Sequence, residues 1–385
     1  MHRAHNSPVL HPAIQATSVA QVPTGIRANQ YENTNWDLLA SNPRQLDEIA
    51  SFWRALETDI TSPIRQYLWS ESCSATVPLD GKLHFVVVKT GSRTGAIAPL
   101  VRAKGPLGRL EHLGVSVLRE PTDLVFSDLA ALKSLADALV KLGSPLFLGR
   151  IPADSPTIAA FQDAYRGRGL VLLRPAQPFP RIVLHEGWRK PENQLNSGRR
   201  SDLRRAVRTA EKIGPLTYQI LSPSPSQLAP ILEEALEVEA ANWKGSEGTA
   251  IARDHLRGPF YRHYAAAASA AGILRVCFLR VGGKAVAMQL ALECSGGFWL
   301  LKIGYREEFA RCSPGMLLMA ETIRYAASRG LASYEFLGNT DNWTRVWTSD
   351  EMPTVTIRAY PFRVKGIVAL TVDTFQAVLR RLQWS

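Results

Sequence analysis

The chain reads GFWLLKIGYREEFARCSPGMLLMAETIRYAASRGLASYEFLGN from Gly297 to Asn339. The apolar run Gly297–Tyr305 is strand-like and leads, through a polar segment, to Arg311-Cys312-Ser313-Pro314-Gly315. An alanine- and leucine-rich helix follows, and then a further strand, Ala332–Leu337. Serine commonly caps a helix, and proline at the first helical position loses no hydrogen bond. Because first-turn N–H groups attract anions, this order predicts a nucleotide pyrophosphate site at the helix start, with an ordinary capped helix as the alternative.

Further strands flank this stretch. Ile273–Val281 and Lys284–Glu293 are apolar runs joined by Gly282-Gly283, which predicts a hairpin. Thr354–Tyr360 has the pattern of a late strand, and Gly366–Leu382 that of a closing helix. Hairpins mixed with helices predict an α+β fold with mixed central sheets flanked by helices.

The N-terminal half shows the same mixture of helices and hairpins, without a residue-level repeat. We expect one domain over residues 36–180 and a second over 181–385, with the proline-rich segment Arg174–Pro180 as the linker. Residues 1–35 lack hydrophobic periodicity, which predicts a flexible N-terminal extension.

The composition is that of a soluble globular protein, with 46% hydrophobic and 21% charged residues. No run of about 18 apolar residues occurs, so we expect no membrane span, and the N-terminus lacks the apolar segment of a signal peptide. The four cysteines are widely spaced, which favours reduced thiols, a cytoplasmic location and no metal. The net charge of +11 suits nucleotides, nucleic acid or an anionic membrane face, without choosing among them.

Arginines cluster on one predicted helix that ends at Gly214. At about 100° per residue, Arg204, Arg205 and Arg208 lie opposite Leu203, Ala206 and Val207. One interpretation is a solvated face of an ordinary amphipathic helix. The other is a platform for a phosphate-bearing substrate or an acidic polymer, since arginine binds phosphate and carboxylate in a bidentate manner. No aromatic residues alternate with the arginines, so stacking on single-stranded nucleic acid is not expected.

The order and wording of four segments resemble the GNAT acyltransferase superfamily, in its BioF2-like or CelD (cellulose biosynthesis) acetyltransferase branch. These segments are Leu195–Gly214, Trp243-Lys244-Gly245, Ser313-Pro314-Gly315, and Tyr334–Gly338 followed by Trp343–Trp347. One position departs from the family wording, because Thr344 stands where relatives usually have lysine. The resemblance implies tandem GNAT-like domains, an arrangement shared with Fem-type transferases.

The resemblance also implies a binding site for acetyl-CoA or another acyl-CoA. The strand Leu300–Gly304 would pair with the pantetheine arm, and the helix start would hold the pyrophosphate. The cofactor-binding residues implied are Lys302, Ile303, Gly304, Arg311, Ser313, Gly315 and Met316.

Trp243 and Lys244 match the family's Trp-Lys pair, which implies a place near the acceptor; by themselves they end a helix. Arg345 and the arginines Arg204, Arg205 and Arg208 are further acceptor-binding candidates. Removal of a proton from the attacking amine requires a base, for which the candidates are Asp341, Glu335 and Tyr305. No histidine falls within these motifs and G-x-S-x-G is absent, so a Ser/His/Asp triad is unsupported.

The leading hypothesis is an acyl-CoA-dependent N-acyltransferase, or less readily an O-acyltransferase, with a small-molecule or sugar amine as acceptor. A link to exopolysaccharide or cellulose biosynthesis rests on the resemblance alone. A Fem-like transferase that uses aminoacyl-tRNA is the second hypothesis, and it predicts salt-sensitive tRNA binding. A catalytically degenerate module that binds an acidic polymer or a synthase subunit is the third. The sequence leaves the acceptor, the acyl chain and the oligomeric state open.

Overall fold

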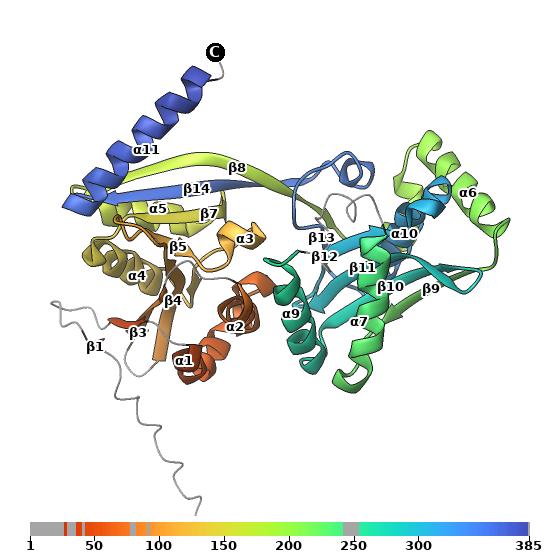
Figure 1. Ribbon diagram of the computed structural model, residues 1–385, viewed down its shortest axis with the longest axis horizontal. Coiled ribbons are helices and arrows are strands. Elements are labelled where there is room, and N and C mark those ends of the chain that lie inside the picture. Colours follow the sequence, from red (N-terminus) through yellow and green to blue (C-terminus); the bar gives the residue numbers. More distant parts are fainter. Residues whose placement is uncertain are drawn as a thin grey trace, which may run out of the picture.

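A computed structural model describes residues 27–28, 36–40, 43–77, 82–90, 93–241 and 254–383. The described residues form one mixed 14-stranded sheet flanked by helices (Figure 1). The predicted α+β class, with mixed sheets flanked by helices, is confirmed, although the sheet of each half joins that of the other. Among these residues, no helix is both long and apolar enough to span a membrane.

The first half of the chain alternates strands and helices up to one long strand. Its elements are β1 (Arg27–Ala28), β2 (Trp36–Ala40), α1 (Pro43–Leu56), α2 (Tyr67–Thr76), β3 (Lys82–Thr90), β4 (Arg93–Arg102), β5 (Leu110–His112), α3 (Val115–Leu118), β6 (Val125–Phe126), α4 (Leu129–Leu142), β7 (Leu146–Pro152), α5 (Pro156–Tyr165) and β8 (Gly169–Val183). The expected N-terminal extension lies outside the described residues except for Arg27–Ala28, which pair with β2.

The second half contains the stretch Gly297–Asn339. Its elements are α6 (Ser197–Glu211), β9 (Leu216–Leu221), α7 (Pro225–Ala240), α9 (Gly258–Ala270), β10 (Leu274–Val281), β11 (Lys284–Cys294), β12 (Gly297–Tyr305), α10 (Pro314–Ser328), β13 (Ser333–Glu335), β14 (Glu351–Pro361) and α11 (Val364–Gln383). The predicted hairpin is β10–β11, which turns at Gly282 and Gly283, both with positive φ.

The expected linker Arg174–Pro180 is wrong, because these residues continue β8. They pair with β14, and β8 then pairs with β13 on its other edge from Arg181 to Val183. Prolines are tolerated at strand edges and bulges, and the β8–β14 register shifts beside Pro178, between Met352 and Thr354. The strand order is β1-β2-β3-β4-β5-β7-β14-β8-β13-β12-β11-β10-β9, so β14 returns from the end of the chain into the sheet of the first half. The division at residue 180 remains a prediction, and it falls inside a strand.

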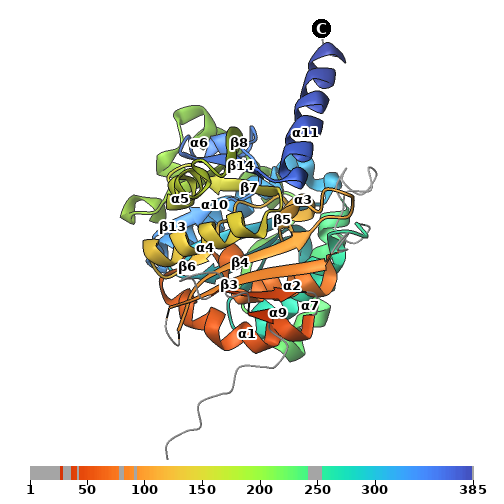
Figure 2. The same ribbon diagram turned by 90° about the vertical axis from the view of Figure 1, so that its left-hand side faces the viewer.

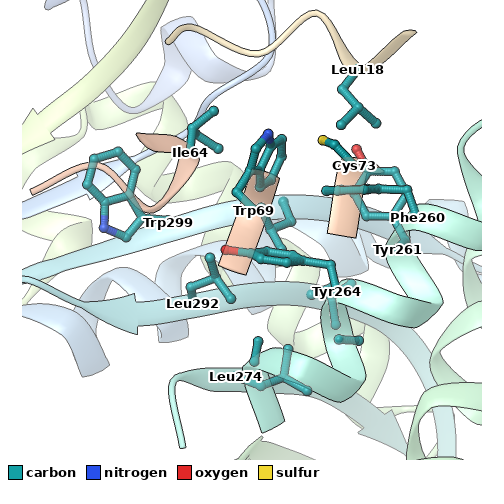
Figure 3. Packing of buried hydrophobic residues seen from close by; sticks show 14 of the residues in the cluster. Ile64, Trp69, Cys73, Leu118, Phe260, Tyr261, Tyr264, Leu274, Leu292 and Trp299 are labelled. Atoms are coloured by element: carbon teal, nitrogen blue, oxygen red, sulfur yellow. The ribbon is translucent and has the colours of Figure 1, made fainter. Parts of the chain in front are cut away.

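The two halves share an apolar core. Trp69 of α2 packs against Phe260 and Tyr264 of α9, with ring centroids 4.7 and 5.0 Å apart (Figure 3). In the second half, α7 and α9 cover one face of β10–β12 and α10 covers the other. Side chains on β12 therefore alternate between an α7/α9 side and an α10 side.

Candidate active site

Strands β12 and β13 run parallel and then separate. Their ladder joins Gly297–Trp299 to Ser333–Glu335 and ends there, while β12 continues to Tyr305. Leu290 pairs with Lys302 and Ala291 with Leu300, so Leu301 is an extra residue that forms a bulge. A bulge bends its strand and is common beside functional sites. Among the described strands, none pairs with Lys302–Tyr305 on the β13 side, so this edge offers backbone groups to an extended ligand.

Helix α10 follows β12 after the 3-10 segment Glu307–Cys312, and its first turn lies beside Tyr305, the last residue of β12. Ser313 is the N-cap residue, but its hydroxyl makes no capping bond, contrary to the usual role of a capping serine. Its backbone instead lies in the left-handed region, at φ 45° and ψ 51°, and its carbonyl accepts from the N–H groups of Met316 and Leu317. Such a conformation costs on the order of 1–3 kcal/mol and is found at ligand-binding positions. It turns the chain abruptly into the helix.

A pocket of about 580 Å³ lies between the free edge of β12 and the start of α10. A Cβ placed on Gly315 would meet only Tyr305 Cδ1, at 3.9 Å, so the helix start is open at that point. The lining residues are Met288, Gln289, Ile303, Gly304, Tyr305, Ala310, Ser313, Pro314, Gly315, Met316, Leu318, Met319, Asp341, Trp343 and Trp347. The structure thus brings together five of the predicted cofactor residues, namely Ile303, Gly304, Ser313, Gly315 and Met316.

Lys302 points away from this pocket. Its ammonium lies 4.6 Å from the centre of the Tyr261 ring of α9, on the α7/α9 side. Burial lowers the pKa of Lys302, and the negative charge of Glu120 acts in the opposite direction. Only the backbone of Lys302 is therefore placed for a ligand in the pocket.

The three candidate bases differ in position. Asp341 and Tyr305 line the pocket, whereas Glu335 does not. Glu335 pairs with Trp299, which belongs to the core on the α7/α9 side, and burial raises the pKa of its carboxyl group. Burial, followed by the charge of Glu307, raises the pKa of Tyr305, so its hydroxyl stays protonated and suits a proton donor better than a base.

Asp341 begins the short turn that carries Thr344. The Asp341 N–H donates to the Thr344 hydroxyl at 3.0 Å, and that hydroxyl donates to the Asp341 carbonyl at 2.8 Å. The Trp343 indole N–H lies 3.3 Å from Asp341 Oδ2. Thr344 is fully buried, and its hydrogen bonds to Asp341 fix the loop that presents the Asp341 carboxylate.

One polar residue of the pocket was not selected from the sequence. Gln289 is 1% exposed and contacts Met319 Sδ at 3.6 Å, while the Tyr334 hydroxyl lies 3.4 Å from its amide oxygen. The sequence signal was a lone amide within the apolar run of β11. A buried amide beside a ligand pocket supplies a fixed hydrogen-bonding group.

Some of the candidate arginines line pockets, as an anion-binding platform would require, and others lie on a solvated face. Arg205 and Arg311 line a second pocket of about 200 Å³ beside Ser313 and Met316, together with Arg199, which the sequence analysis did not select. Arg345 and Arg199 line a shallow pocket that opens next to it. Arg204 and Arg208 are exposed and line neither. One edge of α6 therefore faces the start of α10. Trp243 and Lys244 lie outside the described residues.

The first half of the chain holds the turn that follows β13. Leu337 and Gly338 both have positive φ, 53° and 51°. Glu120 accepts from the Gly338 N–H at 3.0 Å, and Arg150 donates to the Gly338 carbonyl at 2.5 Å. These two contacts fix the end of the strand at which β12 and β13 separate. Neither residue was selected from the sequence, because the pairing spans about half of the chain.

Comparison with models of known protein families finds one match. Residues 197–345 match the family model described as "Acetyltransferase (GNAT) domain", a range that includes β12, α10, β13 and Asp341. No curated protein sequence matches the chain. The second half therefore carries a GNAT acetyltransferase domain, and the chain is an acyltransferase.

Solved structures share the fold at low sequence identity. One is the "C-terminal Domain (DUF2156) of Putative Lysylphosphatidylglycerol Synthetase" from Agrobacterium fabrum, with 12% identity over 86% of this chain and 96% of that chain and a TM-score of 0.55. FemX has 12% identity over 83% of this chain and 96% of that chain, with a TM-score of 0.51. A tandem GNAT protein from the clavulanic acid biosynthesis pathway has 13% identity over 85% and 98% of the two chains, with a TM-score of 0.47.

Proposed function

We propose that this protein is an N-acyltransferase that uses acetyl-CoA or another acyl-CoA, bound in the pocket between β12 and α10. The observation that carries the proposal is the meeting of two features in one pocket. The free edge of β12 matches the amides of a pantetheine arm, and the helix start beyond Ser313 matches a diphosphate.

The second pocket supports a cofactor role for one edge of α6. Arg199, Arg205 and Arg311 lie beside Ser313, where the phosphates at the nucleotide end of CoA would emerge from the helix start. Arg205 also pairs with Asp202 at 2.8 Å. We assign these three arginines to the cofactor, and leave Arg204 and Arg208 as a solvated face.

The proposed reaction is direct acyl transfer, with roles for groups that line the pocket. The acceptor nitrogen attacks the thioester carbonyl, a C–N bond forms, and the C–S bond breaks. Backbone N–H groups near Lys302–Gly304 would stabilise the carbonyl oxygen as negative charge develops on it. Asp341 would take the proton from the attacking amine, and Tyr305 would donate one to the departing thiolate.

The acceptor is proposed as a small-molecule or sugar amine. A place in the BioF2-like or CelD branch, and with it a role in exopolysaccharide or cellulose biosynthesis, rests on the sequence resemblance.

A Fem-like transfer from aminoacyl-tRNA is the second candidate. The observation in its favour is the group of arginines that line the second pocket and the shallow pocket beside it, together with the net charge of +11. Such a surface would bind a nucleic acid backbone, with an affinity that falls steeply with salt.

Calorimetric titration with acetyl-CoA and with CoA tests the proposal, followed by a thiol-release assay over a panel of amines and amino sugars. We expect binding in the micromolar range, which is common for enzyme substrates, and amine-dependent thiol release. Absence of CoA binding at millimolar ligand, together with salt-sensitive tRNA binding, would favour the Fem-like reading. CoA binding without thiol release for any acceptor would favour a degenerate binding module.

A further inference from the structure

Helix α11 stands off the body of the molecule, and its far end points away from it (Figures 1 and 2). One polar residue, Asp373, anchors it. The Asp373 carboxylate accepts from Arg109 at 2.7 Å, from Arg358 at 3.0 Å and from the Tyr360 hydroxyl at 2.5 Å. Ala369 packs on the same side of the helix and is fully buried. The side of α11 that faces the protein is therefore narrow and partly polar.

The opposite side of α11 is apolar and exposed. Val364 is 79% exposed and Phe375 is 63% exposed. At about 100° per residue, the exposed apolar side chains gather on one arc centred opposite Asp373. They are Val364, Ile367, Val368, Val372, Phe375, Val378 and Leu379. Between Val364 and Leu379, Thr371 is the one polar residue on this arc, and no charged residue lies on it. Core-facing helices turn such an arc inward, whereas α11 turns it outward.

The charges of the helix complement an anionic surface. Asp373 is the only acidic residue of α11, and it is bound on the inner side. Arg363 precedes the helix, Lys365 lies in its first turn, and Arg380 and Arg381 lie near its end. Both ends of the apolar arc are thus basic, on a chain of net charge +11.

We propose that α11 docks the protein on the surface of an anionic phospholipid bilayer, with the helix lying in the interface. A wide exposed apolar arc with basic residues near its ends is a pattern that binds at the interface of an anionic membrane, and in α11 the opposite side is occupied by the contacts of Asp373 with the protein. Anionic lipids attract such basic residues within about a Debye length. The inference stands apart from the proposed transfer reaction, because it uses none of the pocket residues.

A second copy of the chain fits this face less well. A two-stranded coiled coil uses a narrow seam, whereas the arc of α11 is wider than one seam requires. Both ends of α11 are basic, so parallel and antiparallel pairing each place like charges together. A lipid surface avoids that repulsion and covers the whole arc.

The test is co-sedimentation of the full-length protein with vesicles of phosphatidylcholine alone and of phosphatidylcholine with phosphatidylglycerol. We expect binding to the anionic vesicles that weakens with salt, and much weaker binding to the neutral ones. The double variant Val368→Ser/Phe375→Ser should reduce binding to anionic vesicles at least tenfold. The matched control is Leu129→Ser/Ile213→Ser, which changes two side chains that are each 58% exposed but lie outside α11. It should bind as the parent does.

Three results would overturn the proposal. They are no association of the parent protein with anionic vesicles, equal binding by the α11 variant and the control, and a parent dimer in light scattering that the α11 variant converts to a monomer. Circular dichroism and thermal melting of both variants show that the fold is retained. Should the double variant unfold, Lys365→Gln provides the second measurement, because its binding must still show a weaker salt dependence.

Discussion

Two backbone positions at the start of α10 carry the proposed cofactor site. Ser313 takes a left-handed conformation that is uncommon for a residue other than glycine, and Gly315 leaves open space beside Tyr305. The first property belongs to the backbone, and the second is the absence of a side chain. Both positions therefore shape the pocket through the backbone and the space beside it.

Replacing Gly315 by valine should weaken CoA binding at least tenfold with little change in thermal stability. The added Cβ meets only Tyr305 Cδ1 at 3.9 Å, so the protein has room for it, but the branched side chain would occupy the approach to the helix N–H groups. Calorimetric titration with CoA measures the effect. Gly198→Val is the matched control, since Gly198 is also the second residue of a helix and is exposed. Equal CoA affinity in the two variants would refute the pyrophosphate assignment.

Glu120→Gln should raise the melting temperature at neutral pH. Burial raises the pKa of Glu120, although the Gly338 N–H and the charges of Lys302 and Arg150 act in the opposite direction. A carboxyl group whose pKa is raised on folding costs stability as pH rises through that folded pKa. Glutamine keeps an acceptor for Gly338 without the charge. Melting curves of parent and variant should converge in acid, below the usual pKa of glutamate. A variant less stable than the parent at neutral pH would contradict this.

At the scale of elements, the site depends on how closely α7 approaches β12. A Cβ on Gly304 would lie 2.5 Å from the Cα of Glu239, which is backbone and has little freedom to move. Gly304 therefore allows the helix to pack directly on the strand whose other residues line the pocket.

Gly304→Ala should destabilise the protein by about 1–3 kcal/mol, the usual range for overpacking a tight contact. Urea denaturation measures the change in the free energy of unfolding. Gly315→Ala serves as the control, because the same added methyl group has room there and should cost less than about 0.5 kcal/mol. Similar losses in both variants would show that the α7–β12 contact is not the cause.

The polar contacts that hold helix α11 on the protein converge on the carboxylate of Asp373. Burial alone would raise the pKa of Asp373, but hydrogen bonds from Arg109 and Tyr360 and the charges of Arg109 and Arg358 together lower it. Asp373→Asn should reduce the local stability of α11 by about 1.5 kcal/mol, the lower end for a hydrogen bond to a charged group, because solvent screens this surface site. Hydrogen exchange of the α11 amides measures it.

The pH dependence of that anchor has a definite sign. A carboxyl group whose pKa is lowered on folding contributes stability above its unfolded pKa and loses it as pH falls through the folded pKa. Protection of α11 should therefore fall in acid in the parent, and change less with pH in Asp373→Asn. Asp163→Asn is the control, since Asp163 pairs with Arg166 at an exposed site. Unchanged protection in Asp373→Asn would show that packing alone holds the helix.

For the molecule as a whole, β8 and β14 join the two halves. β14 pairs with β7 on one edge and with β8 on the other, although it lies far later in the chain than either. A fragment of residues 36–180 therefore lacks the strand between β7 and β8. We expect it to show no cooperative unfolding transition on its own, and to regain one when residues 348–383 are supplied separately. A sharp transition in the isolated fragment would support the predicted division at residue 180.

Much of the fold was predictable because it depends on local patterns. The closing helix expected at Gly366–Leu382 lies within α11, the late strand expected at Thr354–Tyr360 lies within β14, and the hairpin at Gly282-Gly283 is β10–β11. Periodicity and turn residues encode such elements within a few positions of the chain. Ser313 and Gly315, for which the order of strand, helix start and strand predicts a pyrophosphate site, line the pocket beside β12, and their role there remains a prediction.

Contacts between distant residues required the tertiary structure. Arg174–Pro180 has the composition of a linker, yet it pairs with β14 in the sheet. The Thr354 hydroxyl of β14 also donates to the carbonyl of Gln177, which lies 177 residues earlier in the chain. Strand alternation left the direction of Glu335 open, and packing turned it from the pocket while Asp341 remained. Glu120 and Arg150 hold Gly338 from the other half of the chain. A local sequence pattern determines which residues can form a strand or start a helix. Which side of that element contacts a partner depends on the free energy of packing against segments that are far away in the sequence.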